Sequence, residues 1–270
     1  MKGNEEGKII SSSLNELVER FSRQNIVAEI EKRYQSAPSR LIPVSQIDDI
    51  PLISEVVIPD EVISYYAQTL REKGFYSSLV VRPKGNERYE IILGRKRFLG
   101  AKKAGMVSLP CTFAEVGEEE MLLMLLADTR DQREGNVMEM ALVCDRLQKG
   151  FGYSQLTLAE LSHQSRCQIS NILRLLTLPK PIQKDICLKK LSYGQARALV
   201  GLKEEDALAF AKHIKEEKIS VRKCEAEIRT LRKREKKTEP DYSYSIDGNI
   251  LRIDFQSEEK LAEFITKNLK

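Results

Sequence analysis

Apolar residues recur every three or four positions from residue 12 to residue 35, after a polar start. This spacing predicts one or two amphipathic helices that end at Ser36-Ala37-Pro38. Their polar faces mix acidic and basic side chains, whereas a helix that lies on a membrane carries mostly Lys and Arg. An apolar helix face indicates burial but does not identify the surface that covers it. Docking on a protein partner and packing on the chain's own domain therefore both stay open.

Residues 41–134 alternate between short apolar runs and helical spacing, which predicts a small α+β domain. One helix is expected over 60–73, where Gly74 ends it, and another over 95–104, where Gly105 ends it. The apolar runs between and beside these helices predict strands at 41–44, 78–82, 89–93 and 110–113.

Glu118-Glu119-Glu120 opens a very apolar helix, and from Asn136 to about Leu202 the pattern is helical almost throughout. The 20 residues 218–237 then contain nine Lys or Arg against three Glu, a local balance of 9 − 3 = +6. A solvated helix face is the ordinary explanation of such a run. Nonspecific contact with a polyanion is the functional alternative.

Residues 239–270 predict a strand, a turn, a second strand and a helix. The apolar runs 242–246 and 250–255 flank Asp247-Gly248-Asn249, which is typical of a hairpin, and Ser257 can cap the final helix. A unit of about 30 residues cannot bury a core of its own. We therefore expect this tail to pair with a copy of itself or to pack on the rest of the chain.

Composition excludes some classes of protein. The net charge of 44 − 40 = +4 cannot by itself indicate a nucleic-acid partner. The longest apolar stretch, Met121 to Ala127, is far shorter than the roughly 20 residues that cross a bilayer, so we expect a cytoplasmic protein without a membrane partner. Five widely spaced cysteines without a C-x-x-C pair argue against a zinc site or a disulfide framework, so no metal ligands are assigned.

Two polar clusters are candidates for binding chemistry. Gly94 breaks a predicted strand and Arg95-Lys96-Arg97 opens the next helix, which gathers backbone N–H groups and three cations at one helix N-terminus. Phosphate is the natural ligand there, and cations that simply face solvent are the alternative. Residues 129–134 form a second cluster at a predicted domain junction, where a charged linker is the simpler explanation.

Two amphipathic segments within residues 153–176, separated by a short polar turn, predict a helix-turn-helix. Ser165 is the expected N-cap of the second helix, and Pro179 and Pro181 are expected to close it. The residues predicted on its core face are Ile169, Ile172, Leu173 and Leu176. Its open face carries donor-rich side chains suited to a major groove. The predicted DNA contacts on this helix are Ser165, Arg166, Gln168, Ser170, Asn171 and Arg174.

Three motifs in this order resemble the ParB family of chromosome and plasmid partition proteins. Residues 94–105 resemble the family's Arg-rich box, residues 170–179 its helix-turn-helix, and residues 191–199 the segment that follows. The resemblance implies a multidomain α+β chain with a ParB and sulfiredoxin-like N-terminal domain, an all-α helix-turn-helix domain and a small ββα dimerisation tail. The predicted boundaries are 1–40 for a helical arm, 41–134 for the nucleotide-binding domain, 135–238 for the DNA-binding domain with its basic helix, and 239–270 for the tail.

The resemblance also implies an activity. Family members are homodimeric, CTP-dependent DNA clamps that recognise a palindromic, centromere-like parS site in the nucleoid, and a ParA-type ATPase is the usual partner. The residues that match nucleotide-binding positions, or line the same pocket, are Ser77, Ser78, Arg82, Gly94, Arg95, Lys96, Arg97, Gln132 and Arg133. Further DNA contacts are expected from Arg197, Arg232, Lys233 and Arg234.

Some positions depart from the family pattern. Arg95 lies where the box has Glu, and Thr129 and Arg130 lie where a second motif has Glu and Asn. Arginine cannot ligate Mg²⁺, so nucleotide binding is expected while Mg²⁺ binding and CTP hydrolysis are in doubt. Ser77-Ser78 in place of Gln-Pro, and Gln195 in place of His, are milder departures.

Two other functions are alternatives to a partition protein. A nucleoid-occlusion or transcriptional regulator of the same family, with a nucleotide pocket that does not hydrolyse, would differ in partner and not in chemistry. An enzyme is the other alternative, since the N-terminal domain also resembles sulfiredoxin and a free-serine kinase. Sulfiredoxin chemistry needs a cysteine where this chain has Arg95 to Arg97, and a kinase needs a carboxylate base, for which Glu90 and Asp128 are candidates by composition only. No catalytic residue is assigned.

Overall fold

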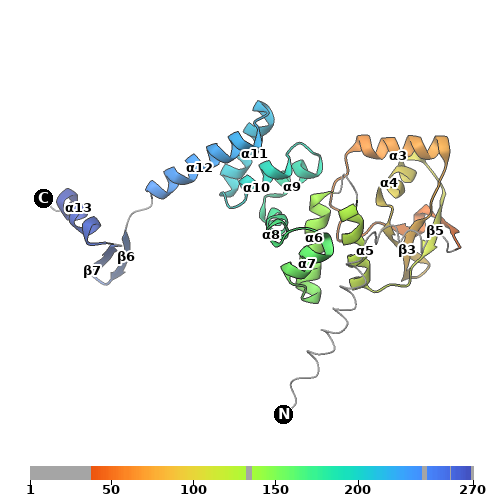
Figure 1. Cartoon of the computed structure of the whole chain (residues 1–270), viewed down its shortest axis with the longest axis horizontal. Helices are drawn as coiled ribbons and strands as arrows, with labels where there is room; N and C mark the ends of the chain where they lie inside the picture. The colour runs from red at the N-terminus through yellow and green to blue at the C-terminus, as the bar shows by residue number, and fades with distance from the viewer. Residues whose placement is uncertain (1–37, 132–135, 239–241, 256, 269–270) are drawn as a thin grey trace, which may run out of the picture. The chain divides into compact units, whose positions relative to one another are not determined.

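The computed structural model describes residues 38–131, 136–238, 242–255 and 257–268 (Figure 1). The predicted helices of residues 12–35 lie outside these ranges. The chain divides into two compact units, residues 1–218 and residues 219–270. Within the described ranges, every helix is too short or too polar to cross a bilayer.

The first unit begins with a five-stranded mixed sheet of order β1-β5-β3-β4-β2. Strands β3 and β5 are parallel, as are β2 and β4, whereas β1 pairs antiparallel with β5 and β3 with β4. The strands are β1 (Arg40–Pro43), β2 (Ile47–Asp48), β3 (Leu79–Gly85), β4 (Arg88–Leu93) and β5 (Ser108–Phe113). This sheet with its helices confirms the predicted α+β class, although β2 and the short 3-10 helix η1 (Val44–Gln46) were not predicted.

Helices α3 (Asp60–Lys73) and α4 (Arg95–Ala104) pack on each other beside the sheet and have the predicted bounds (Figure 1). Gly100 of α4 lies against α3, where an added Cβ would come within 2.6 Å of the Tyr66 Cβ. A larger residue would therefore push the two helices apart. This close packing fixes the position of the first turn of α4. That turn carries the predicted phosphate-binding residues 94–97, called here the phosphate box.

Helix α5 (Glu118–Asp131) joins the sheet to a group of smaller helices, since it contacts β4, α6 and α7. The apolar run from Met121 to Ala127 is buried throughout, which explains why this helix shows no polar face there. The helices that follow are α6 (Val137–Phe151), α7 (Gln155–Ser162), α8 (Arg166–Arg174), α9 (Lys180–Cys187), α10 (Tyr193–Leu199) and α11 (Glu204–Glu217).

The second helix of the predicted helix-turn-helix is shorter than its apolar pattern predicts. Helix α8 ends at Arg174 and continues as the 3-10 helix η2 (Leu175–Thr177). Leu175 is therefore buried, while Leu173 and Leu176, both predicted in the core, are only half-buried. The two prolines do not close this helix but open the next one, because Pro179 caps α9 and Pro181 lies in its first turn. Proline is tolerated there because the first turn needs no N–H donor.

The second unit contains α12 (Val221–Thr238) and the predicted hairpin and helix: β6 (Tyr242–Asp247), β7 (Ile250–Phe255) and α13 (Glu258–Asn268). The antiparallel register pairs Tyr244 with Ile253 and Ile246 with Leu251, which places these four residues on one face. The Phe255 ring of β7 and the Phe264 ring of α13 meet with centroids 5.1 Å apart. Tyr244, Ile246 and Leu251 stay 65%, 70% and 56% exposed. The tail therefore presents an apolar face that the described residues of this unit leave uncovered.

Candidate nucleotide and DNA sites

The phosphate box lies at the start of α4, directly after β4. Gly94 is the N-cap and has a φ of +96°, a left-handed conformation that favours glycine. An added Cβ would come within 2.7 Å of Leu79 Cδ2 and 2.9 Å of Arg97 Nη2. Gly94 has no side chain with which to cap this helix, and such a helix N-terminus is suited to bind an anion, as the sequence predicts. The three cations that follow Gly94 point to three different environments.

Arg97 joins the box to the residues before β3. Its Nη1 donates to the Ser77 carbonyl at 2.8 Å and the Ser78 carbonyl at 3.5 Å, and it also contacts the Ser77 hydroxyl. The Ser78 hydroxyl lies 2.7 Å from the Thr112 hydroxyl of β5. The structure therefore brings together Ser77, Ser78 and Arg97, three of the residues predicted to bind nucleotide.

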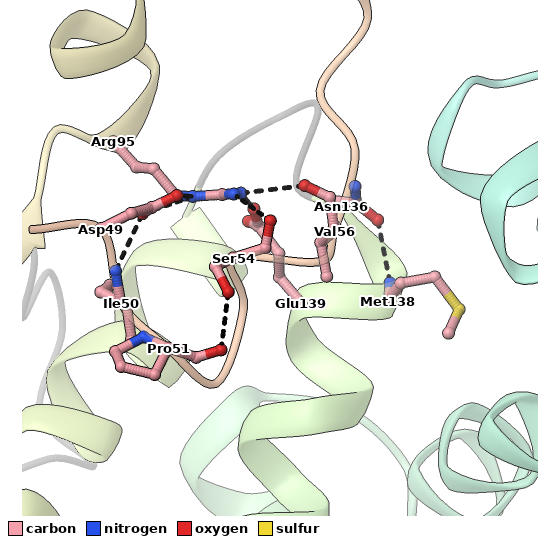
Figure 2. Close-up of polar contacts among 9 residues, drawn as sticks. All are labelled: Asp49, Ile50, Pro51, Ser54, Val56, Arg95, Asn136, Met138 and Glu139. Atoms are coloured by element: carbon pink, nitrogen blue, oxygen red, sulfur yellow. Dashed lines mark hydrogen bonds and ion pairs between the residues drawn. The ribbon is translucent and has the colours of Figure 1, made fainter.

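Arg95 is 9% exposed, and its guanidinium lies among groups of the segment after β2 and of α6 (Figure 2). Its Nε donates to both carboxylate oxygens of Asp49 at 2.8 and 3.0 Å, and its Nη1 donates to Glu139 Oε1 at 2.9 Å and the Val56 carbonyl at 3.2 Å. Its Nη2 donates to the Ser54 carbonyl at 3.3 Å. The guanidinium that was predicted to face phosphate is thus engaged by protein groups. A contribution of Arg95 to a nucleotide site would come from its backbone N–H.

Arg82 is also engaged by a neighbour. Its Nε donates to Glu90 Oε2 at 2.6 Å across the β3 and β4 pair, and Glu90 is only 3% exposed. Burying this carboxylate requires a charged partner, which Arg82 provides. Glu90, a candidate kinase base, is therefore engaged in a structural ion pair. The nucleotide contact of Arg82 stays a prediction.

Lys96 lines a cavity of about 450 Å³ between the α/β part and the small helices of the first unit. Asn136 and Glu139 of the α6 N-terminus, with Lys190 and Tyr193 near α10, also line it. Burial raises the pKa of Glu139, and the neighbouring positive charges of Arg95 and Lys96 offset part of that rise. The two remaining predicted contacts, Gln132 and Arg133, lie outside the described residues.

The Mg²⁺ implied by the family resemblance does not fit the residues at its expected positions. Arg95 offers a cation, and Thr129, 8% exposed, donates its hydroxyl to the Leu126 carbonyl at 2.9 Å within its own helix. Mg²⁺ requires oxygen ligands, usually carboxylates and phosphates. The side chain of Arg130 lies outside the described part of the chain. In the described ranges no group of three or more His, Cys, Asp or Glu side chains could hold a metal.

Helix α8 has the predicted N-cap and an exposed first turn. The Ser165 hydroxyl accepts from the Gln168 backbone N–H at 3.2 Å, and Gln168 Oε1 accepts from the Ser165 N–H at 2.8 Å, which completes a capping box. Arg166 and Arg174 are exposed, and Ser170 and Asn171 are half-buried. Gln168 therefore has a structural role that was not predicted, since its carbonyl oxygen caps the helix, although the residue as a whole is exposed.

The segment after α9 repeats this design. Ser192 and Gln195 form a second capping box at the start of α10, with Gln195 Oε1 accepting from the Ser192 N–H at 2.8 Å. This contact accounts for Gln195 where the family has His. Arg197 lies exposed on the same helix. Arg232, Lys233 and Arg234 lie in α12, and their side chains are outside the described part of the chain.

Sequence reasoning missed the two carboxylates that hold Arg95. Glu139 lies three residues after Asn136, whose side chain accepts from the Met138 N–H at 3.0 Å and caps α6. This spacing is a helix-start signal, but nothing in it indicates Arg95, which is 44 residues away. Asp49 lies in a segment without periodicity, 46 residues before Arg95. Only the fold brings the three together.

Comparisons with known proteins find matches for both the N-terminal part and the helical part of the chain. A family model described as the ParB N-terminal domain matches residues 28–129, and one described as the ParB HTH domain matches residues 133–233. A probable chromosome-partitioning protein ParB of Pseudomonas putida is 32% identical over 205 residues, which cover 76% of this chain and 70% of that protein. The Bacillus subtilis stage 0 sporulation protein J is 34% identical over 173 residues, 64% of this chain and 61% of that protein.

Solved structures of a related protein also match. A C-terminally truncated ParB from Caulobacter crescentus, crystallised with the centromeric parS site, is 28% identical with a TM-score of 0.43 and covers 71% of this chain and 100% of that chain. The same protein with CTP-gamma-S is 27% identical with a TM-score of 0.34, covering 66% and 99%. The two family models and the 32% identity to the Pseudomonas protein show that this chain belongs to the ParB family of chromosome-partitioning proteins.

Proposed function

We propose that this chain is a partition protein that binds a palindromic parS-like DNA site as a homodimer and is gated by CTP. Its membership of the ParB family makes DNA partition the first function to test. The observation that carries the DNA part of the proposal is the first turn of α8, which a capping box fixes and which leaves Arg166 exposed. A rigid helix with an exposed arginine at its N-terminal end is suited to contact base edges in a major groove.

Nucleotide binding at the start of α4 is supported by local geometry. Gly94 lets an anion approach the backbone, and Arg97 fixes the Ser77-Ser78 segment beside the same turn. We expect CTP to bind there without hydrolysis, because Arg95 and Thr129 provide no carboxylate for a metal, and the Thr129 hydroxyl is engaged within its own helix. Gln132 and Arg133 stay predicted contacts on the family resemblance.

The apolar face of the tail supports a homodimer. Tyr244, Ile246 and Leu251 lie together on one face of the hairpin and are more than half exposed, and a second copy of the same face would bury them. Two DNA-binding units on a dimer would match the two halves of a palindrome. A ParA-type ATPase as partner, the basic α12 as a nonspecific DNA contact, and a place in the nucleoid stay predictions from the family resemblance.

Selection of DNA sequences by the full chain tests this function without assuming a particular binding site. The chain would be mixed with a random pool of DNA duplexes, and the bound fraction would be sequenced over several rounds. We expect the enriched sequences to share an inverted repeat, and the Arg166→Ala variant to lose that enrichment while still retaining some DNA at low salt. A wild-type pool that stays random would contradict the proposal.

A further inference from the structure

Arg95 connects three segments that are far apart in the sequence (Figure 2). It lies in the first turn of α4, Asp49 and the Ser54 and Val56 carbonyls lie in the segment after β2, and Glu139 lies in the first turn of α6. We propose that Arg95 is a positioning residue that fastens the α/β domain to the DNA-binding helices, so that the turn carrying the phosphate box also sets the position of α6. This structural role of Arg95 does not depend on the proposed function. The effect of nucleotide on the contact, however, rests on the proposed nucleotide binding.

The segment from Asp49 to Val57, called here the bridging segment, is held by buried side chains and by hydrogen bonds within the segment. The side chains of Ile50, Ile53 and Val56 are buried, and the Ile53 and Val56 N–H groups donate to carbonyls within the segment at 3.1 and 2.9 Å. Asp49 Oδ1 also accepts from the Ile50 N–H at 2.9 Å. A carboxylate and two carbonyls held in this way form a fixed acceptor site, which matches the planar fork of a guanidinium.

The other end of the contact belongs to the DNA-binding part. Glu139 is 13% exposed and lies in α6, and α6 contacts α8, the predicted recognition helix. A continuous set of contacts therefore runs from the phosphate box through Arg95 and Glu139 to α8. Contiguous packed elements of this kind are one route by which two sites influence each other.

The contact with Glu139 is the buried part of a broader junction. Lys180 of α9 also pairs with Glu55 of the bridging segment at 3.2 Å, but both side chains are nearly four-fifths exposed. An exposed pair of this kind contributes little, whereas a buried ion pair whose partner is removed leaves an uncompensated charge. Without Arg95, two partly buried carboxylates, Asp49 and Glu139, would remain without this partner. Of these two ion pairs, the one made by Arg95 is therefore the contact that matters to the fastening, beside the apolar packing of α5 on α6.

Amide hydrogen exchange on the full chain, followed by mass spectrometry, tests the fastening in the absence of nucleotide. In Arg95→Met we expect exchange to rise by about tenfold or more both in the bridging segment and in α6 from Met140 onwards. Arg95→Lys should give an intermediate rise, because an ammonium keeps the charge but loses the fork. Lys103→Met, which removes an exposed pair with Asp60 at the other end of α4, is the matched control and should change neither segment.

A rise confined to the bridging segment, or no rise in either segment, would overturn the proposal. If Arg95→Met does not fold, Arg95→Lys and Glu139→Gln decide the matter, since each weakens the contact without removing all its hydrogen bonds. Glu139→Gln should loosen α6 more than the bridging segment, and an unchanged α6 in both variants would count against the fastening.

Adding CTP to the wild-type chain tests the link to nucleotide. We expect slower exchange at Ser77 and Ser78 and a change in α6, which should be smaller in Arg95→Lys. Slower exchange at the serines without a change in α6 would remove the link and leave the fastening. If CTP alters neither region, the proposed nucleotide binding fails, and the fastening is judged by the nucleotide-free variants alone.

Discussion

The first turns of α4 and α8 begin with similar sequences and differ in what their side chains do. Both follow a small N-cap residue and carry an arginine at the first helical position, Arg95 in α4 and Arg166 in α8. Arg95 is 9% exposed and donates to two carboxylates and two carbonyls, whereas Arg166 is exposed. The first arginine is part of the protein's own structure, and the second is available to a partner.

The N-terminal caps of the two helices also differ: side chains cap α8, whereas the N-cap residue of α4 is a glycine. In α8 the Ser165 and Gln168 side chains satisfy the N-terminal groups, so the helix end needs no external anion. In α4 the N-cap residue is Gly94, which has no capping side chain, so this helix end is suited to bind an anion. A ligand would therefore contact α4 mainly through its backbone, and α8 through its side chains.

Replacing Arg95 should have the largest effect on stability. Arg95→Met removes the partner of two partly buried carboxylates and should lower the free energy of unfolding by about 3 kcal/mol. Lys103→Met, which breaks an exposed pair on the same helix, should cost less than about 1 kcal/mol. Urea unfolding followed by circular dichroism measures both, and equal costs would mean that the Arg95 contacts contribute no more than a surface pair.

Replacing Arg166 should have the next largest effect, on DNA binding alone. Arg166→Ala should weaken binding to the selected DNA site by about 1–3 kcal/mol and leave stability nearly unchanged, because the side chain is exposed. Fluorescence anisotropy with specific and scrambled duplexes separates the two kinds of binding. An equal loss for both duplexes would assign Arg166 to phosphate contact and not to base contact.

Two changes at Gln168 separate its roles in capping and in DNA contact. Gln168→Ala removes the capping side chain and should cost about 1 kcal/mol of stability as well as DNA affinity. Gln168→Glu keeps an acceptor for the Ser165 N–H but removes the amide donors, so stability should hold while DNA binding weakens. If Gln168→Glu binds DNA as well as the wild type, the residue acts only as a cap.

The smallest expected effect is a pH dependence that Glu139 causes. Burial raises its pKa in the folded chain, so the folded state holds this proton more tightly than the unfolded state. The group's contribution to stability therefore falls as pH rises from below its ordinary pKa through the raised one. Glu139→Gln lacks this titration, so its stability relative to the wild type should improve between pH 4.5 and pH 7. A constant difference in urea midpoints would contradict the assignment.

Local signals predicted the elements whose ends are set by nearby residues. Gly74, Gly94 and Gly105 set the bounds of α3 and α4, and Ser165 set the start of α8. The two-residue strand β2 was missed because it is too short to show a period. Pro181 was misjudged because proline both ends helices and opens them, and the sequence does not say which.

The sequence predicted which residues belong to the candidate sites better than it predicted how their side chains are directed. The box at the start of α4 and the face of α8 follow from residue types and spacing. The separate directions of Arg95, Lys96 and Arg97 do not, because they depend on partners brought close by the fold. For Arg95 these partners are 46 and 44 residues away. Sequence identifies the donors, and only the fold decides which of them a ligand can use.

Calorimetric titration of the full chain with CTP, in Mg²⁺ and then in EDTA, tests whether nucleotide binds at the start of α4 without a metal. ATP, GTP and UTP serve as controls, and phosphate release would be measured with the selected DNA present. We expect CTP to bind equally well in both buffers and no phosphate to be released, because binding uses the α4 backbone and Arg97 while Arg95 and Thr129 offer no carboxylate to a metal. CTP binding that requires Mg²⁺, or the absence of any nucleotide binding, would contradict this expectation.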